Sequence, residues 1–497
     1  MTRRPRGRRR PSVALLTVVL LLLAACTSST HESPHHRTHF SPGRITGTTS
    51  PNIVFVLTDD LSMNLVAHMP HVLGLEHAGT TMSDFHVVDS LCCPSRSATF
   101  TGEFPHDDGV FRNTGSDGGY SGFNAHGDRE RSFSIALQRA GYRTALMGKY
   151  LNGYDPADGV PPGWDEWDVA GNGYAQYNYT LNEDGRQQHF GSKPQDYLTD
   201  VLSGKAAGFI RSSAARREPF MLEVATFAPH KPSTPAPRYA NAFPFLRYPR
   251  TPAYDALPTG AASWLRSSPA LSASQQQFID QQYRKRVQSD LAVDDLIGNL
   301  QRTLQATGAA KNTYFVFNSD NGYHMGEYRL LPGKQTAYDT DTHVPLVVTG
   351  PGVPAGRVAP QLASNIDLAP TFENLVGARV PKTVDGVPLT PLWHGQAPLL
   401  WQRALLIEHH GPANAKNDPD GQALRSGAPP TYSAVRTADA LYVRYRNGQQ
   451  EYYDTQTDPN ELHNIAAAGV PPALTHTLVA LTTCHGAAQC QAAAGAP

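Results

Sequence analysis

Residues 92–102 read Cys-Cys-Pro-Ser-Arg-Ser-Ala-Thr-Phe-Thr-Gly and predict a loop that turns into a helix. Pro94 suits the first helical position, because the N–H that proline lacks would have no partner there. Gly102 suits the position after the helix. Cys92 is therefore expected just before a helix N-terminus, where free N–H groups and the helix dipole favour negative charge. Arg96, one turn further on, can pair with an anion through two hydrogen bonds. A buried thiol before an ordinary helix is the alternative that composition alone favours.

The length and composition indicate a large, loop-rich globular protein. A chain of 497 residues can bury a sizeable core and suggests two or three domains. Hydrophobic residues at 40%, with 42 Gly and 40 Pro, exclude a fibrous or disordered chain. The formal net charge of −1 includes six arginines within residues 3–10, and without them it would be −7. A mildly acidic chain argues against nucleic acid as the partner.

The first 26 residues predict an export signal. An arginine-rich start is followed by the apolar run Val13–Ala25, which is too short for a comfortable membrane span. The run ends in Leu23-Ala24-Ala25-Cys26, which resembles a bacterial lipobox, whose cysteine is acylated and becomes the new N-terminus. Cleavage near the same Ala-Ala pair without acylation is the alternative. We predict a lipoprotein-type signal peptide over 1–26 and a flexible tether over 27–49, with the protein either anchored at the bacterial cell surface through a lipid on Cys26 or secreted.

The remaining cysteines divide into a pair and two neighbours. Cys484 and Cys490 lie close together near the end of an exported chain and are natural disulfide partners. Cys93 is left over beside Cys92 and is predicted to be buried. Free or metal-bound thiols are the alternative, but no Cys/His spacing in the chain is typical of a zinc site.

Two predicted buried strands each end in polar side chains. Asn52–Leu57 and Thr313–Phe317 are nearly continuous apolar runs, as expected for strands buried on both faces of a parallel sheet. Ligand sites in such sheets lie beyond the carboxyl ends of the strands. The side chains that follow these two strands are Asp59, Asp60, Asp320 and Asn321. Oxygen ligands with several carboxylates suit a hard divalent ion, Ca²⁺ or Mg²⁺. Helix caps or turns are the alternative for each pair taken alone.

The rest of the chain predicts an α/β domain followed by a smaller antiparallel one. The predicted helices are 132–140, 196–212, 274–305 and 368–376, and the further predicted strands are 142–147, 220–227 and 344–349. Residues 153–195 and 232–271 are predicted as long loops that shape a pocket. The antiparallel strands expected after Leu400 are 405–409, 431–437, 441–446 and 450–454, with a terminal helix over 472–483. We predict a catalytic domain over 50–397 and a small α+β domain over 398–497.

The string Cys92-Cys93-Pro94-Ser95-Arg96 resembles the Cys-x-Pro-Ser-Arg signature of type I sulfatases, in which the first cysteine is oxidised to formylglycine (3-oxoalanine). Further motifs match this family in the same order: Thr58-Asp59-Asp60, Gly148-Lys149-Tyr150, Asp320-Asn321-Gly322, Lys334 with Tyr338, and Tyr453-Asp454 through Asp458-Pro459. Within the family the chain is most similar to the N-acetylglucosamine-6-sulfatase branch, through residues 91–96, 148–152, 196–202 and 320–324. The resemblance implies the fold of the alkaline phosphatase superfamily, with a large mixed sheet between helices and a small C-terminal antiparallel sheet.

The resemblance also implies a site. Asp59, Asp60, Asp320 and Asn321 would hold Ca²⁺, or Mg²⁺, together with the formylglycine made from Cys92 by a formylglycine-generating enzyme. The hydrated aldehyde would supply the nucleophilic oxygen. Arg96, Lys149 and Lys334 would neutralise charge on the sulfuryl oxygens, and His230 would handle the leaving-group proton. His324 is a weaker candidate near the metal.

The implied activity is calcium- and formylglycine-dependent hydrolysis of sulfate esters, of sulfated sugars such as N-acetylglucosamine 6-sulfate. A broad arylsulfatase and a phosphonate monoester or phosphodiester hydrolase with the same chemistry are the alternatives. A non-catalytic glycan-binding lipoprotein is a third, although every residue of the implied site is present. One departure stands out: Leu151-Asn152 occupy the place where many sulfatases carry a histidine after the lysine, so the base that expels sulfate is left open.

Overall fold

The computed structural model describes residues 50–396, 398, 401–411, 418, 421 and 424–495. The predicted signal peptide over 1–26, the lipidated Cys26 and the tether over 27–49 lie outside the described residues. Within the described part of the chain, no helix combines the length and the apolar character needed to cross a membrane.

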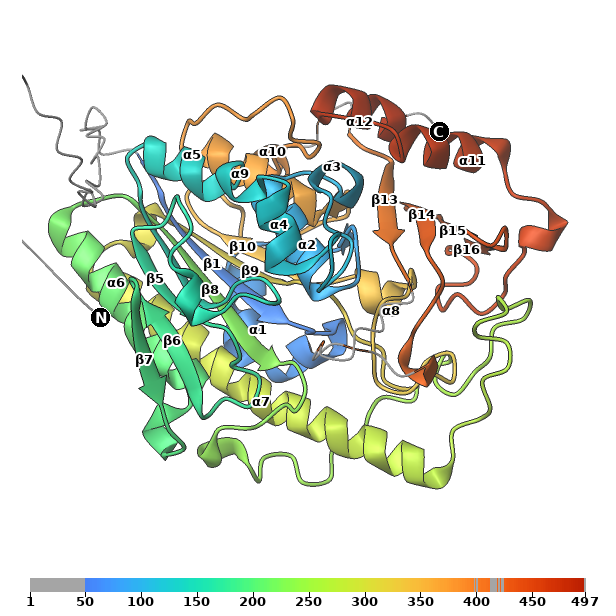
Figure 1. The fold of residues 1–497 in the computed structure, drawn as a ribbon, viewed down its shortest axis with the longest axis horizontal. Helices are drawn as coiled ribbons and strands as arrows, with labels where there is room; N and C mark the ends of the chain where they lie inside the picture. Colours follow the sequence, from blue (N-terminus) through green and yellow to red (C-terminus); the bar gives the residue numbers. More distant parts are fainter. Residues whose placement is uncertain are drawn as a thin grey trace, which may run out of the picture. The chain divides into compact units, whose positions relative to one another are not determined.

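A ten-stranded mixed sheet forms the larger part of the fold (Figure 1). Its strand order is β11-β2-β10-β9-β1-β8-β4-β5-β6-β7. The central strands from β9 to β5 run parallel, whereas β10, β6 and β7 pair antiparallel with their neighbours. The strands are β1 (Asn52–Asp59), β2 (Thr80–Met82), β4 (Arg143–Lys149), β5 (Glu166–Ala170), β6 (Tyr179–Glu183), β7 (Arg186–Phe190), β8 (Phe220–Pro229), β9 (Thr313–Ser319), β10 (Leu346–Thr349) and β11 (Arg357–Ala359). The predicted large mixed sheet is confirmed.

Helices cover both faces of this sheet, and β1 shows why. Val54 and Val56 contact one helical layer, and Ile53, Phe55 and Leu57 contact the other, all at most 1% exposed. Full burial of such a side chain stabilises the fold by about 1.5–3 kcal/mol. The first layer contains α1 (Pro70–Ala78), α6 (Leu198–Arg216) and α7 (Ala273–Ala306). The second contains α2 (Cys92–Thr101), α4 (Gly119–Ala125), α5 (Phe133–Arg139), α9 (Leu368–Leu375) and α10 (Thr390–Trp393).

A four-stranded antiparallel sheet follows in the C-terminal part, as predicted. Its strands are β13 (Ala404–His409), β14 (Tyr432–Thr437), β15 (Ala440–Tyr445) and β16 (Gln450–Asp454). Helix α11 (Pro472–Leu481) packs on it through Leu478, and α12 (Ala487–Gly495) ends the described chain. The core of this sheet includes Ala98 of α2 and Phe104, so the small sheet packs directly against the segment that carries Cys92.

Two local predictions are wrong. Residues 166–190 form β5, β6 and β7 instead of a loop. β7 lies at the edge of the sheet and is mostly exposed, so it lacks the hydrophobic alternation by which a strand is recognised. Helix α2 begins at Cys92, not at Pro94. Proline is tolerated at the third position because none of the first four helical N–H groups has a partner within the helix. Gly102 ends the helix in the left-handed conformation, at φ +72°, as expected.

Candidate active site

The predicted metal ligands lie at the carboxyl ends of two adjacent parallel strands. β1 pairs with β9 up to Thr58 and Ser319. The next residues along each strand, Asp59, Asp60 and Asp320, are therefore neighbours. The backbone N–H of Asp60 donates to Asp320 Oδ1 at 3.0 Å. Asp60 has a φ of +67°, a left-handed conformation that non-glycine residues adopt mainly at turns and functional sites.

Cys92 completes this group from the start of α2. Its Sγ lies 3.1 Å from Asp59 Oδ1 and 3.8 Å from Asp60 Oδ1, and it is fully buried. One potential ligand atom from each of Asp59, Asp60, Cys92 and Asp320 lies within 4.8 Å of the others. The thiol occupies the position that an oxygen of formylglycine would take after oxidation of Cys92. Two strand ends and one helix start thus converge on a single point.

The donor set fits a divalent cation. Asp60 Oδ2 and Asn321 Oδ1 are buried oxygens without a hydrogen-bond partner among the residues that the structure describes. The Asn321 amide is oriented by donating from Nδ2 to Asp60 Oδ1 at 2.8 Å. Buried polar atoms are costly unless they are satisfied. Carboxylate and amide oxygens are the ligands preferred by Ca²⁺ and Mg²⁺. The residues present therefore suit a hard divalent ion.

Three buried cations surround the carboxylates. Lys149 Nζ lies 2.6 Å from Asp59 Oδ2, and Lys334 Nζ lies 2.6 Å from Asp60 Oδ1 and 2.7 Å from Cys92 Sγ. Arg96 Nε donates to Asp320 Oδ2 at 2.8 Å. All are at most 2% exposed. We call these side chains the charged centre: Asp59, Asp60, Cys92, Arg96, Lys149, Asp320, Asn321 and Lys334.

The cations act unequally on the carboxylates. Burial alone would raise the pKa of Asp59, but Lys149, with His230, Arg96 and Lys334, outweighs burial and lowers this pKa well below its ordinary value. Burial and the negative charge of Asp59 together raise the pKa of Asp320 to about 6. The carboxylates therefore repel one another even among three cations, which is a further reason for a bound metal ion.

His230 follows β8 and also faces this centre. Its Nε2 lies 3.7 Å from Asp60 Oδ2. Its Nδ1 lies 2.6 Å from the carbonyl oxygen of Lys231, which can only accept, so Nδ1 carries a proton and Nε2 is the nitrogen turned toward the centre. The ring centroid lies 4.4 Å from that of Tyr174.

Arg286, from the buried side of α7, supports both ligand loops and was not predicted. It donates to the backbone carbonyl of Asp60. Its guanidinium carbon lies 4.2 Å from the ring centroid of Tyr323, two residues after Asn321. No sequence pattern marks this arginine, because its burial, at 2% exposed, is visible only in the structure. Arg286 can fix the left-handed turn at Asp60 and the loop after β9 together.

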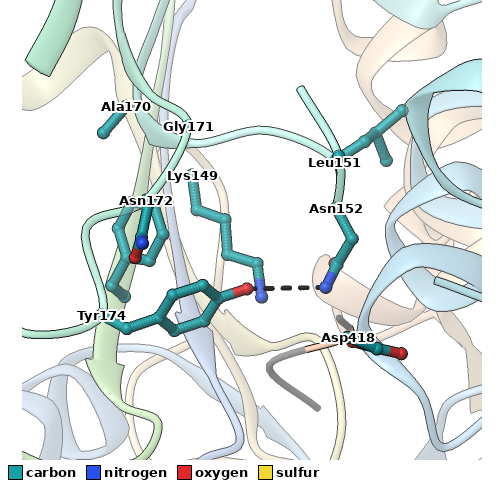
Figure 2. Close-up of a pocket in the computed structure, with 10 residues that line it drawn as sticks. Lys149, Leu151, Asn152, Ala170, Gly171, Asn172, Tyr174 and Asp418 are labelled. Carbon is teal, nitrogen blue, oxygen red and sulfur yellow. Dashed lines mark hydrogen bonds between the residues drawn. The ribbon is translucent and has the colours of Figure 1, made fainter. Parts of the chain in front are cut away.

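A cavity of about 410 Å³ opens beside Lys149 (Figure 2). The ring centroid of Tyr174 lies 5.1 Å from Lys149 Nζ, within the range of a cation–π contact. The Tyr174 hydroxyl accepts a hydrogen bond from Asn152 Nδ2 at 3.5 Å. We call this cavity the pocket. It is lined by Lys149, Leu151, Asn152, Gly153, Ala170, Gly171, Asn172, Tyr174, Phe227 and Asp418.

The remaining predicted residues lie elsewhere. His324 is buried, and its Nδ1 lies 2.9 Å from Asp341 Oδ1, so this side chain is paired with Asp341 and not with the predicted ligands. Cys93 is fully buried, and burial raises the pKa of its thiol to about 12, which makes it unreactive. Cys484 and Cys490 are joined by a disulfide between α11 and α12.

A protein-family model described as Sulfatase matches residues 51–378, and one described as N-sulphoglucosamine sulphohydrolase, C-terminal, matches residues 326–481. The human N-acetylglucosamine-6-sulfatase is 35% identical over 482 residues, which cover 89% of this chain and 86% of that protein. The extracellular sulfatase SULF-1 homolog of Drosophila melanogaster is 32% identical over 410 residues, covering 80% of this chain and 36% of that protein. The solved structure of BT4656 in complex with its substrate D-glucosamine-2-N,6-O-disulfate matches with a TM-score of 0.74 at 22% identity, covering 87% of this chain and 97% of that chain.

Proposed function

This chain belongs to the sulfatase family and is a sulfuric ester hydrolase, and from that premise we propose that it removes the 6-O-sulfate from glucosamine-type sugars. The direct support is the junction of the charged centre with the pocket at Lys149. A sulfate ester reaching the centre would leave its sugar among Asn152, Asn172 and Tyr174, which combine amide groups with an aromatic ring. The likeness to the human N-acetylglucosamine-6-sulfatase over most of both chains supports the choice of sugar.

We assign the metal site to Asp59, Asp60, Asp320 and Asn321, with residue 92 as an additional ligand, and we propose Ca²⁺ as the ion. When bound, the ion would polarise the sulfate oxygens. We further propose that Cys92 is the residue converted to formylglycine by a formylglycine-generating enzyme, which would supply a hydroxyl nucleophile in place of a thiol. The burial of Cys92 between Asp59 and Lys334 supports this assignment, because those charges can orient an oxygen at that position.

The chain's own cations hold the ester. Arg96 and Lys149 can neutralise charge on the sulfuryl oxygens as it spreads in the transition state. Lys334, 2.7 Å from Cys92 Sγ, can hydrogen-bond to the oxygen that residue 92 would carry. In a site closed to water these interactions are stronger than at the surface.

His230 is the proposed general acid. The Lys231 carbonyl keeps the proton on Nδ1, so Nε2 is the position at which a second proton is held and released. Nε2 lies 3.7 Å from Asp60 Oδ2, and with a second proton on Nε2 the ring carries the proton that a general acid must donate. This ring can then give its Nε2 proton to the sugar oxygen as the sulfur–oxygen bond breaks. Tyr174 packs against His230 and limits its movement.

We propose that the protein is exported, with a lipid anchor on Cys26. The arginine-rich start and the apolar run before Cys26 support this. The likeness to an extracellular sulfatase homolog supports export, though not the anchor.

The test compares kcat/KM on N-acetylglucosamine 6-sulfate, an aryl sulfate and an aryl phosphonate monoester, with protein co-expressed with a formylglycine-generating enzyme and supplied with Ca²⁺. We expect the 6-sulfated sugar to give the highest value, and removal of Ca²⁺ by a chelator to abolish turnover of all three. Higher kcat/KM on the aryl sulfate would indicate a broad arylsulfatase. Higher kcat/KM on the phosphonate would overturn the proposed reaction.

A further inference from the structure

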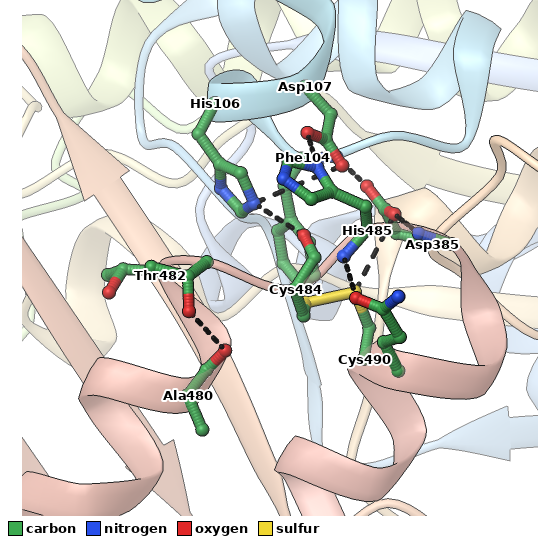
Figure 3. The surroundings of a disulfide bond; sticks show 12 residues. Phe104, His106, Asp107, Asp385, Ala480, Thr482, Cys484, His485 and Cys490 are labelled. Atoms are coloured by element: carbon green, nitrogen blue, oxygen red, sulfur yellow. Dashed lines mark hydrogen bonds and ion pairs between the residues drawn. A yellow bond between two sulfur atoms is a disulfide. The ribbon is translucent and has the colours of Figure 1, made fainter.

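A second group of metal-ligating side chains lies where the C-terminal helices meet α3 (Pro105–Asp108) (Figure 3). His106 and Asp107 come from α3, and His485 comes from the turn between α11 and α12. One potential ligand atom from each lies within 4.8 Å of the others. His485 Nδ1 is in close contact with Asp107 Oδ1. Two segments that lie 378 residues apart in the sequence are thus brought together.

Both ring nitrogens of His106 face oxygen atoms. Nδ1 lies 2.7 Å from Glu408 Oε2. Nε2 lies 3.0 Å from the carbonyl oxygen of Cys484 and 4.0 Å from Asp107 Oδ2. A carbonyl oxygen and a carboxylate cannot donate hydrogen bonds. Nε2 therefore carries either a proton that it donates to these oxygens or a metal ion shared among the donors.

We propose that His106 Nε2, the Asp107 carboxylate, His485 Nδ1 and the Cys484 carbonyl oxygen form a binding site for a divalent metal ion of the zinc class. Two imidazoles with one carboxylate favour zinc over calcium, which prefers oxygen ligands throughout. Four donors match the four-coordinate geometry of structural zinc sites. Glu408 accepts the Nδ1 proton of His106, as carboxylates do behind metal-bound histidines, and so leaves Nε2 for the metal.

The segments that carry these donors are held in place independently of the donors themselves. Asp385 accepts the backbone N–H of Phe104 at 2.8 Å and that of Gly486 at 2.6 Å. The Cys484–Cys490 disulfide closes the turn that carries His485. The site thus has a preformed frame, and a bound ion would fasten the C-terminal helices to the segment that directly follows α2 and Cys92.

A second histidine–aspartate pair, with similar exposure, provides a comparison. His463 and Asp458 have side chains 67% and 12% exposed, against 66% and 13% for His485 and Asp107. Their closest ring-to-carboxylate distance is 3.5 Å, and no third ligating group joins them among the described residues. His463 is therefore a suitable control for His485.

The test uses the full mature protein, treated with a chelator and reloaded with excess Ca²⁺ so that the charged centre is occupied. Zn²⁺ is then titrated by calorimetry, and Co²⁺ is followed by its visible absorption. We expect wild type to bind one Zn²⁺ and to gain thermal stability. His485→Ala should weaken binding about 10- to 100-fold, and Asp107→Asn should act in the same direction. His463→Ala should match wild type.

Two results would overturn the proposal. The first is an absence of Zn²⁺ binding by the Ca²⁺-loaded protein, which would leave His106 as a protonated side chain between Glu408 and Cys484. The second is equal binding by wild type, His485→Ala and His463→Ala, which would mean that the metal binds elsewhere. Sulfatase activity is not used as a readout, so the result is independent of the proposed substrate.

Discussion

The charged centre and the pocket share Lys149 but are built differently. The side chains of the centre lie at strand ends, on helix α2 or, for Lys334, in a loop. They are buried, and ion pairs as short as 2.6 Å hold them together. The wall of the pocket comes from strand ends and loops, and two of its polar groups, Asn172 and Tyr174, are exposed or half-exposed. A buried, mutually restrained cluster suits chemistry common to all substrates. A half-exposed wall suits selection among them.

The most severe loss of turnover is expected when the proposed nucleophile Cys92 is replaced, and a much smaller one when its neighbour Cys93 is replaced. Cys92→Ala should lower turnover of every sulfate ester by about a thousandfold or more, because nothing else in the centre can attack sulfur. Cys93→Ala should keep most turnover and cost about 1 kcal/mol of stability, since it deletes one buried sulfur. Turnover of both purified variants, with the mass of the wild-type peptide that contains Cys92, provides the measurement. The reverse pattern would place the oxidised residue at position 93.

The next largest effect is expected at Arg286, which is not a proposed metal ligand but contacts the two loops that carry the ligands. Arg286→Met removes the donor to the Asp60 carbonyl and the contact with Tyr323. We expect Ca²⁺ affinity, measured by calorimetry, to fall about 10- to 100-fold, and excess Ca²⁺ to restore kcat. Arg238→Met is the control, because Arg238 is 38% exposed and pairs with surface carboxylates. A lower melting temperature with unchanged Ca²⁺ affinity would show that Arg286 supports the fold only.

The first of these predictions concerns a residue that the sequence identifies, Cys92, and the second concerns one that it does not, Arg286. The family, the reaction and the mixed sheet were predicted correctly. Cys92 and the acidic strand ends were found because each is marked by a contiguous pattern: a signature, or an apolar run that breaks into carboxylates. Arg286 has no such pattern, because its role depends on a contact with a residue 226 positions away.

Residues 153–195 were predicted to shape a pocket, and they do contribute to its wall, but the individual residues could not be named for a related reason. Tyr174 lies in a Gly-, Tyr- and Asn-rich segment that resembles any polar loop, and its role depends on where β5 places it beside Lys149 and His230. Asn152 was noticed only as a departure from the family pattern. The roles of such residues depend on tertiary contacts, which local sequence patterns do not record.

The third prediction tests whether the wall selects substrates. Tyr174→Ala removes the ring that contacts Lys149 and His230, and a cation–π contact contributes about 0.5–2 kcal/mol. We expect kcat/KM on the 6-sulfated sugar to fall about tenfold. Tyr174→Phe, which loses only the hydroxyl bonded to Asn152, should stay within about threefold. Tyr177→Ala is the control, since Tyr177 packs on Tyr197 and does not line the pocket.

The ratio between substrates decides the interpretation of this third test. If the wall selects the sugar, Tyr174→Ala should lower kcat/KM more for N-acetylglucosamine 6-sulfate than for a small aryl sulfate. Equal losses on both substrates would assign Tyr174 to the charged centre, as a residue that positions Lys149 and His230.

The smallest effect on turnover is expected for Glu223, a buried residue of β8 in the large sheet. Glu223 is fully buried in β8, and neither of its carboxylate oxygens has a hydrogen-bond partner among the described residues. Burial raises its pKa from 4.5 to about 8, although Arg96 opposes the shift. At neutral pH the folded protein therefore holds a proton on Glu223 that the unfolded chain releases. The contribution of Glu223 to the free energy of unfolding should be greatest below pH 4.5 and should fall as the pH rises toward 8, by up to about 1.4 kcal/mol per pH unit.

Glu223→Gln resembles the protonated acid and should remove this part of the pH dependence. Denaturant unfolding at pH 5, 6.5 and 8 should show the variant gaining stability relative to wild type as the pH rises, with turnover at pH 6.5 unchanged within about twofold. Glu218→Gln, just before the same strand with a side chain 43% exposed, should show no such trend. A large loss of turnover in Glu223→Gln would instead extend the charged centre into the sheet, because it would mean that Arg96 needs a negative charge at position 223 to act on the ester. A parallel fall in stability of both variants with pH would exclude Glu223 as the titrating group, since its carboxyl would then titrate no differently in the folded and unfolded chains.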